Sequence, residues 1–172
     1  MTDDTARQLV LLRHAKSESS DASDLERPLT DQGRKDASAA GTWLAGLGAA
    51  PGLALCSTAE RAKETWKLVA AELPQQPKVV YDEKLYEASL GELLALVNET
   101  ADEVSDLLVV GHNPGMHALA EALAGEAEGD LDAQMRRTTF PTSAIAVLTF
   151  NGSWKSVEHG GARLVAYWAP KA

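Results

Sequence analysis

The sequence predicts an α/β fold, a three-layer α/β/α sandwich with a mainly parallel central sheet. Continuous apolar runs, such as those at residues 9–12 and 107–110, are typical of strands buried on both faces, whereas half-exposed strands alternate. Segments with the apolar spacing of helices follow these runs, and further strand-like runs lie near the C-terminus. Strands that alternate with helices indicate a sheet covered by helices on both faces.

The first predicted elements are a strand and a helix joined by a polar connection. The strand is the run LVLL at residues 9–12, and the polar connection covers residues 18–28. Thr30 then has the chemistry of a helix N-cap. Apolar residues keep helical spacing from there until Gly48, which is typical of a helix stop.

The following elements continue the alternation. A buried strand over residues 53–56 leads at once into a helix that carries Arg61 in its first turn. Another buried strand over residues 107–110 runs into the GHNPG segment, where Pro114 suits the first helical position. The remaining predicted elements are a strand at 78–81, a helix at 90–99, a helix at 116–124, a surface loop at 125–132, a strand at 144–150, and two antiparallel strands near 154–157 and 163–168.

Composition limits the class of protein. The chain has 172 residues, of which 45% are hydrophobic and 24% charged, and this fits a single domain over residues 1–172. The net charge of −9 argues against a nucleic-acid partner, because nucleic-acid-binding proteins cluster Lys and Arg. The apolar runs are too short to cross a bilayer and the N-terminus is polar and acidic, so we expect no membrane and a cytoplasmic location. A single cysteine excludes an internal disulfide.

Basic side chains follow three of the predicted strands at the points where the strands end. Arg13 and His14 follow the first strand, Arg61 follows the second, and His112 follows the strand at residues 107–110. If these strands are parallel, the four side chains meet outside the carboxyl ends, where α/β proteins bind ligands. Helix N-termini and arginine forks both suit phosphate oxygens. The sequence therefore predicts a phosphate pocket at this edge of the sheet.

His14 has the chemistry of a nucleophile in such a pocket. Nearby guanidinium charges disfavour the imidazolium, so the ring stays neutral with a free lone pair. A neutral imidazole aimed at phosphorus can attack it and form a phosphohistidine intermediate. Arg13, Arg61 and His112 would hold the phosphoryl oxygens as charge develops, which is electrostatic catalysis without a metal. We therefore expect no metal and no cofactor.

Three motifs resemble the signature of the histidine phosphatases, the phosphoglycerate-mutase-like superfamily. They are Arg13-His14, the segment Ser57-x-x-x-Arg61-Ala62-x-x-Thr65, and the segment Gly111-His112-Asn113-Pro114-Gly115. The short chain and the RPLTxxG segment at residues 27–33 are similar to the small SixA-type branch of phosphohistidine phosphatases. The resemblance implies a phosphoglycerate-mutase-like fold with His14 as the phosphorylated nucleophile. It also implies that Arg13, Arg61 and His112 bind the phosphate.

The chain departs from the superfamily pattern at two positions. Ala15 stands where a glycine usually follows the Arg-His pair, and Ser20 stands where the sugar-phosphate mutases carry an asparagine. Such mutases are also longer, with extra segments that close over the substrate. The missing asparagine and the short chain favour a phosphatase over a mutase.

Glu87 is a candidate general acid. The segment LYE at residues 85–87 resembles the Leu-x-Glu segment with which larger superfamily members protonate a departing alcohol, an acid that SixA itself lacks. An alkoxide leaves poorly without such help, whereas an imidazole can leave a phosphoramidate already protonated. Glu87 therefore bears on the substrate class. Lys16 and Arg27 are candidates for a positive rim that would contribute to substrate binding.

The function that the sequence favours is a metal-independent phosphatase that removes phosphate from phosphohistidine in proteins. The chain offers little material for a lid, which favours a macromolecular substrate. The alternatives are a small-molecule phosphomonoesterase of the same superfamily and a non-catalytic module that binds phosphoanions. The expected partner is a phosphorylated protein or a small phosphorylated metabolite, and the protein itself is expected to be a monomer.

Three other residues with reactive side chains are expected to be structural. Cys56 is separated from Arg61 by four residues, one fewer than in cysteine-dependent phosphatases, so we expect it in the core. His117 lies within the helix that follows His112 and is expected on its surface or in the core. His159 lies in a glycine-rich turn and is expected to be exposed.

Overall fold

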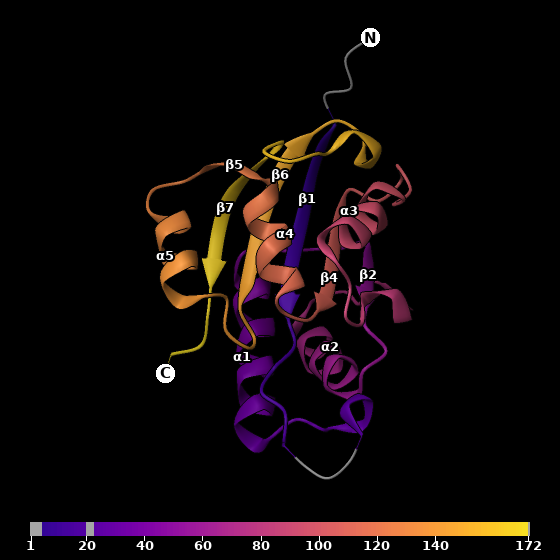
Figure 1. Ribbon diagram of the computed structural model, residues 1–172, viewed down its shortest axis with the longest axis vertical. Coiled ribbons are helices and arrows are strands. Elements are labelled where there is room, and N and C mark those ends of the chain that lie inside the picture. The colour runs from indigo at the N-terminus through magenta and orange to yellow at the C-terminus, as the bar shows by residue number, and fades with distance from the viewer. Residues whose placement is uncertain (1–4, 20–22, 172) are drawn as a thin grey trace.

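The computed structural model describes residues 5–19 and 23–171 of the chain. Over these residues it contains a seven-stranded sheet with the strand order β3-β2-β4-β1-β6-β7-β5 (Figure 1). The strands are β1 (Ala6–Arg13), β2 (Leu53–Cys56), β3 (Lys78–Tyr81), β4 (Asp106–Gly111), β5 (Ala124–Ala127), β6 (Ile145–Asn151) and β7 (Ala162–Trp168). The pairs β1–β4, β2–β4 and β2–β3 are parallel, and β6 runs antiparallel to both β1 and β7. Ser20 and residues 1–4, on which two of the sequence predictions rest, lie outside the described residues.

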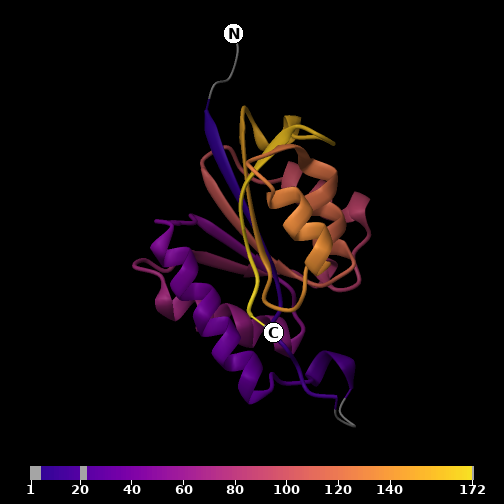
Figure 2. The same ribbon diagram turned by 90° about the vertical axis from the view of Figure 1, so that its left-hand side faces the viewer.

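Helices cover both faces of the sheet (Figure 2). The helices α1 (Asp31–Gly46) and α2 (Glu60–Glu72) pack on one face, and α3 (Leu90–Asn98), α4 (Gly115–Leu123) and α5 (Leu131–Thr138) pack on the other. The predicted three-layer α/β/α sandwich with a mainly parallel sheet is therefore confirmed. Among the described helices, none is long and apolar enough to cross a membrane.

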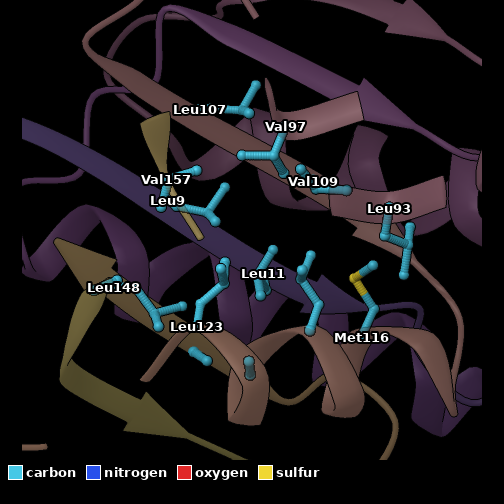
Figure 3. Packing of buried hydrophobic residues seen from close by; sticks show 14 of the residues in the cluster. Leu9, Leu11, Leu93, Val97, Leu107, Val109, Met116, Leu123, Leu148 and Val157 are labelled. Atoms are coloured by element: carbon cyan, nitrogen blue, oxygen red, sulfur yellow. The ribbon is translucent and has the colours of Figure 1, made fainter. Parts of the chain in front are cut away.

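The central part of β1, residues 9–12, is apolar because both faces of the strand are buried. Leu9 and Leu11 belong to the same buried cluster as Val97 of α3 and Met116 of α4 (Figure 3). The intervening residues, Val10 and Leu12, pack on the opposite face with α1 and α2. Full burial of such a side chain contributes roughly 1.5–3 kcal/mol to folding. The core thus fixes β1 firmly and, with it, the position at which the strand ends.

The first turn of α1 supports the segment that follows His14. Thr30 is the N-cap of α1, and its side chain accepts a hydrogen bond from the backbone N–H of Gly33, as the sequence predicts. A Cβ atom on Gly33 would lie 2.1 Å from the carbonyl oxygen of Lys16, so only glycine allows this close approach. α1 ends before Gly48, whose φ of +76° is the left-handed conformation expected at a helix stop.

One strand prediction near the C-terminus is wrong. Residues 154–157 form the 3-10 helix η3 (Trp154–Ser156) in place of a strand. The indole of Trp154 is fully buried, and its Nε1 donates a hydrogen bond to the carbonyl oxygen of Val104 at 2.6 Å. Burial of this aromatic anchor, and not strand pairing, fixes the segment. The prediction of an antiparallel strand near 163–168 is confirmed by β7.

The predicted surface loop at residues 125–132 is also wrong. This stretch contains most of β5, which pairs in parallel with β7, and the start of α5. Gly125 lies so close to the chain at Gly160 that a Cβ atom would be 2.1 Å from the Gly160 carbonyl oxygen. The glycine that resembles a loop signal in the sequence therefore allows close packing beside an edge strand.

Candidate active site

β1, β2 and β4 end side by side, and the chain carries a basic side chain to each end. Arg13 is the last residue of β1 and lies level with Gly111, the last residue of β4. The backbone N–H of His14 donates to the carbonyl oxygen of Gly111 at 3.0 Å, which holds the two strand ends together. Arg61 lies in the first turn of α2, and its Nη2 is 3.5 Å from Nδ1 of His112. The rings of His14 and His112 have centroids 5.1 Å apart, so the structure brings the predicted residues to one place.

A backbone carbonyl fixes the tautomer of His14. Nδ1 of the ring lies 2.8 Å from the carbonyl oxygen of Ala15. Because a carbonyl oxygen only accepts, Nδ1 carries the proton and the lone pair stays on Nε2. Ala15 is held in turn by Thr65, whose Oγ1 accepts from the Ala15 N–H at 2.9 Å and donates to the carbonyl oxygen of Arg61 at 2.7 Å. Through Thr65, α2 therefore positions Ala15. The Ala15 carbonyl keeps the proton on Nδ1 of His14, so that Nε2 is free to act as a nucleophile.

Both histidines of the site are neutral near pH 7. Burial lowers the pKa of His14 to about 3, and the charges of Arg61 and Arg13 act in the same direction, although the hydrogen bond to the following carbonyl opposes them. Burial also lowers the pKa of His112 to about 4, with Arg61 contributing and Asp24 opposing. A neutral ring at His14 is the state that nucleophilic attack requires.

The two arginines keep unpaired donors at the site. Arg13 donates from Nη1 to the carbonyl oxygen of Phe140 at 3.3 Å, and its buried Nε has no partner among the described residues. Arg61 donates from Nη1 and Nη2 to the main chain and carboxylate of Asp24, at 2.6 and 3.0 Å, and its buried Nε is likewise unpaired. Burial and the charge of Arg61 lower the pKa of Arg13. Buried cationic N–H groups without a partner are costly unless an anion completes them.

Asp24 and Tyr86 are residues of the site that sequence reasoning missed. The carboxylate of Asp24 accepts from Arg61, from Nη2 of Arg27 at 2.7 Å and from the hydroxyl of Tyr86. These bonds, led by that of Tyr86, hold the pKa of Asp24 well below its usual range. The ring of Tyr86 stands edge-on to His112 at 5.5 Å between centroids. No sequence spacing shows that the 3-10 helix η1 (Asp24–Glu26) returns to α2, so these contacts arise only from the fold.

A cavity of about 350 Å³ opens beside Arg61 and His112. It is lined on one side by the segment that follows β4, and neither Arg13 nor His14 is among its lining residues. The lining residues are Asp24, Arg61, Tyr86, Glu87, Ala88, His112, Asn113, Pro114 and Gly115. Within the described parts of the chain, no three His, Cys, Asp or Glu side chains are grouped so as to hold a metal ion.

The chain matches the family model of the histidine phosphatase superfamily (branch 1) over residues 9–162. It belongs to this superfamily. An uncharacterized protein of Mycobacterium tuberculosis, Rv1276c, is 41% identical over 162 residues, which cover 93% of this chain and 100% of that protein. The uncharacterized protein ML1117 of Mycobacterium leprae is 39% identical over 165 residues, with the same coverage of both chains.

Solved structures place the chain beside the SixA-type histidine phosphatases. The proposed phosphohistidine phosphatase SixA from Nakamurella multipartitia superimposes with a TM-score of 0.84 and 32% identity, covering 99% of both chains. A protein histidine phosphatase SixA complexed with tungstate gives a TM-score of 0.73 and 27% identity, covering 94% of this chain and 96% of that one. A phosphoglycerate mutase from Plasmodium falciparum shares the fold, with a TM-score of 0.59 and 22% identity over 91% of this chain and 94% of that one. The expected phosphoglycerate-mutase-like fold and the SixA-type resemblance are confirmed.

The other candidate residues of this histidine phosphatase differ in how they contact the site. Glu87 lines the cavity and is exposed, with a left-handed backbone φ of +56°. Arg27 contacts the site through Asp24. Lys16 is exposed and lines a separate cleft of about 780 Å³, together with residues such as Pro141. Roles for these three residues stay predictions.

The residues expected to be structural lie outside the site, as predicted. Cys56 is fully buried at the end of β2, and burial raises the pKa of its thiol to about 12. His117 is partly buried and stacks on Phe140 with 5.8 Å between centroids. His159 is exposed. None of the three lines the cavity.

Proposed function

We propose that the chain is a metal-independent phosphatase, one domain over residues 1–172, that removes phosphate from phosphohistidine in proteins through a phosphohistidine intermediate at His14. Membership of the histidine phosphatase superfamily supports the phosphatase class. One observation carries the mechanism: the lone pair on Nε2 of His14 lies in the same site as two arginines with unpaired buried donors. That combination supplies a nucleophile and an oxyanion site at once.

In the first step, Nε2 of His14 attacks phosphorus. The new N–P bond forms as the P–N bond of the substrate breaks, and the leaving imidazole departs with the N–H that it already carries. Arg13, Arg61 and His112 hold the phosphoryl oxygens as negative charge moves onto them. In the second step, water attacks phosphorus, the bond to Nε2 breaks, and inorganic phosphate leaves with both hydrogens of the water. His14 returns to its neutral form.

Two considerations support phosphohistidine as the substrate. Structures named SixA are 32%, 31% and 27% identical to this chain, and they cover nearly all of it. An imidazole leaving group also needs no general acid, so the reaction can proceed with the buried residues of the site alone. A cytoplasmic location and a monomeric state remain predictions that accompany this proposal.

A second candidate function is a small-molecule phosphomonoesterase. The observation that favours it is Glu87, an exposed carboxylic acid that lines the cavity. Such a group can protonate an alkoxide as it leaves, and this protonation is the step that separates phosphate esters from phosphoramidates. The relative rates on the two kinds of substrate therefore distinguish the two candidates.

The test compares kcat/KM for a phosphohistidine peptide, an alkyl phosphate and p-nitrophenyl phosphate. We expect the phosphohistidine peptide to be the best of the three, and His14→Ala to abolish turnover of all of them. His159→Ala is the matched control, since this histidine is exposed and outside the cavity, and it should retain full activity. Mass spectrometry at alkaline pH should find the phosphoryl group on the peptide that contains His14.

Three results would contradict the proposal. Equal rates of phosphate release by wild type and His14→Ala would contradict catalysis through His14. This result would favour the alternative of a non-catalytic module that binds phosphoanions. Loss of activity with a chelator would contradict the metal-free mechanism. A clear preference for the alkyl phosphate would favour the phosphomonoesterase.

A further inference from the structure

The ring of His112 is held between a buried hydroxyl and the site. Nε2 of His112 lies 2.7 Å from Oγ of Ser57, and Ser57 is fully buried at the end of β2. Nδ1 of the same ring faces Arg61, at 3.5 Å from its Nη2. The nitrogen that faces the site is therefore Nδ1, and the state of Nδ1 decides whether His112 offers a phosphoryl oxygen a proton or a lone pair.

The hydroxyl of Ser57 lies between two hydrogen-bond partners, the backbone N–H of Ala59 and Nε2 of His112. The backbone N–H of Ala59, the N-cap residue of α2, donates to Ser57 Oγ at 3.3 Å. Ser57 Oγ thus already accepts one hydrogen bond, and its single proton is free to point toward Nε2 of His112. If it does, Nε2 accepts and Nδ1 must carry the proton of the neutral ring. A continuous chain of donors then runs from Ala59 through Ser57 and His112 into the site.

The opposite tautomer would need Arg61 to donate to a lone pair on Nδ1. The separation of 3.5 Å between Nη2 and Nδ1 lies at the outer limit for a hydrogen bond, whereas the contact between Ser57 and His112 has an ordinary length. Two N–H groups at that separation can instead donate to one shared oxygen. This is the arrangement expected where an anion is bound.

We propose that Ser57 is a positioning residue that fixes His112 in the Nδ1–H tautomer, so that His112 donates a proton to the phosphoryl group. His14 and His112 then have the same tautomer but turn opposite nitrogens to the substrate. His14 presents the lone pair of Nε2, and His112 presents the N–H of Nδ1. The proposal rests on the phosphoryl-binding role given to His112 under the proposed function, and it explains why only one of the two rings is a nucleophile.

The direct test is nitrogen NMR of protein labelled with ¹⁵N-histidine, recorded without ligand and with tungstate. The His112 signals are assigned by their loss in His112→Asn. In wild type with tungstate, we expect a protonated, pyrrole-type Nδ1 and a pyridine-type Nε2 on His112. In Ser57→Ala, Nε2 loses its donor, and we expect the Nδ1–H form to give way to a mixture or to the opposite tautomer. A pyridine-type Nδ1 in wild type with tungstate would overturn the proposal.

Kinetics test the consequence of that tautomer. Ser57→Ala should lower kcat roughly ten- to a hundredfold, because the oxygen-binding N–H is no longer enforced. Thr100→Ala is the matched control: Thr100 is also buried, but its Oγ1 donates to the carbonyl oxygen of Leu96 and it does not line the cavity, so kcat should not change. Thermal unfolding of both variants shows that the fold is kept. Unchanged kcat and an unchanged His112 tautomer in Ser57→Ala would refute the role of Ser57.

The two proposals fail in different ways. If His112 has the stated tautomer but no turnover depends on His14, the proposed function is wrong and the positioning role of Ser57 stands. If turnover depends on His14 but the His112 tautomer is the opposite one, the phosphatase stands and the role of Ser57 is wrong.

Discussion

Two arginines at opposite ends of β1 show how similar side chains come to serve different purposes. Arg7, near the start of the strand, is 4% exposed, and its guanidinium donates to the carbonyl oxygens of Gly152, Asp102 and Val104 at 2.9, 2.6 and 2.8 Å. The guanidinium of Arg13, at the end of the strand, makes one hydrogen bond of 3.3 Å to the described residues, and its buried Nε has no partner among them. The protein completes the hydrogen bonds of the first guanidinium, whereas the second keeps a donor that the proposed phosphoryl ligand would take.

The hollows at these two ends of the strand differ in the same way as the two arginines. The cleft beside Arg7 has a volume of about 650 Å³, and the cavity beside Arg61 and His112 has only about 350 Å³. The larger hollow nevertheless has the satisfied guanidinium, whereas the smaller one is lined by Arg61, whose buried Nε has no partner among the described residues. The unpaired arginine donors, and not the size of a hollow, therefore coincide with the predicted phosphate site.

The largest effect expected is the loss of catalysis at the Arg13 end. Arg13→Ala should lower kcat/KM roughly a thousandfold, because a guanidinium that stabilises the transition state is lost. The free energy of unfolding should change little, since the guanidinium of Arg13 makes only one hydrogen bond to the described residues. Steady-state kinetics and urea unfolding measure both quantities. A stability loss as large as the catalytic loss would break the comparison between the two ends.

Arg7→Ala should show the reverse pattern. The substitution removes three buried hydrogen bonds, although the Val104 carbonyl oxygen keeps the indole N–H of Trp154, so the free energy of unfolding should fall by about 3 kcal/mol. Folded Arg7→Ala should keep the wild-type kcat, because the residue lies at the far end of the strand from His14. Urea unfolding followed by kinetics at low temperature separates the two effects, and a drop in kcat of the folded protein would contradict this assignment.

Acid should weaken the site end of the molecule. The folded-state pKa of His14 is about 3, below the value near 6.5 of an unfolded histidine. The unfolded chain therefore binds more protons between these values, so the stability from this residue is complete above about pH 6.5 and is lost as the pH falls. For His14 the loss amounts to about 2 kcal/mol at pH 5. Urea unfolding at pH 7 and pH 5 should show a smaller pH effect in His14→Gln than in wild type.

The smallest effect concerns the exposed rim of the cavity. Glu87→Gln should slow hydrolysis of an alkyl phosphate roughly tenfold and leave phosphohistidine hydrolysis within about twofold, because only the alkoxide needs a proton as it leaves. Glu83→Gln is the matched control, since Glu83 is exposed and does not line the cavity. Equal slowing of both substrates in Glu87→Gln would remove Glu87 from the role of general acid.

The sequence predicted the strand ends of the site because their signal is local. A continuous apolar run that stops at Arg13 identifies a buried strand and its end in a few residues, and the same holds for the run before His112. Once the strands are parallel, the convergence of their ends follows from general topology. These parts of the fold needed no knowledge of distant contacts.

The contacts that complete the site depend on distant parts of the chain. Asp24 meets Arg61 across 37 positions and Tyr86 across 62, and nothing near Asp24 in the sequence indicates either partner. The two wrong elements have the same origin. Trp154 has strand propensity but is held by a buried contact to Val104, and Gly125 has loop propensity but packs beside an edge strand. Tertiary packing overrides local preference in each case.

The use of a histidine as the proposed nucleophile has a consequence under oxidising conditions. Cys56 is the one cysteine of the chain, it is fully buried, and its thiol stays protonated because burial raises its pKa to about 12. Peroxide attacks thiolates, which this protein does not expose. An imidazole that carries the phosphoryl group should thus continue to turn over at peroxide concentrations that silence phosphatases built on a reactive thiolate.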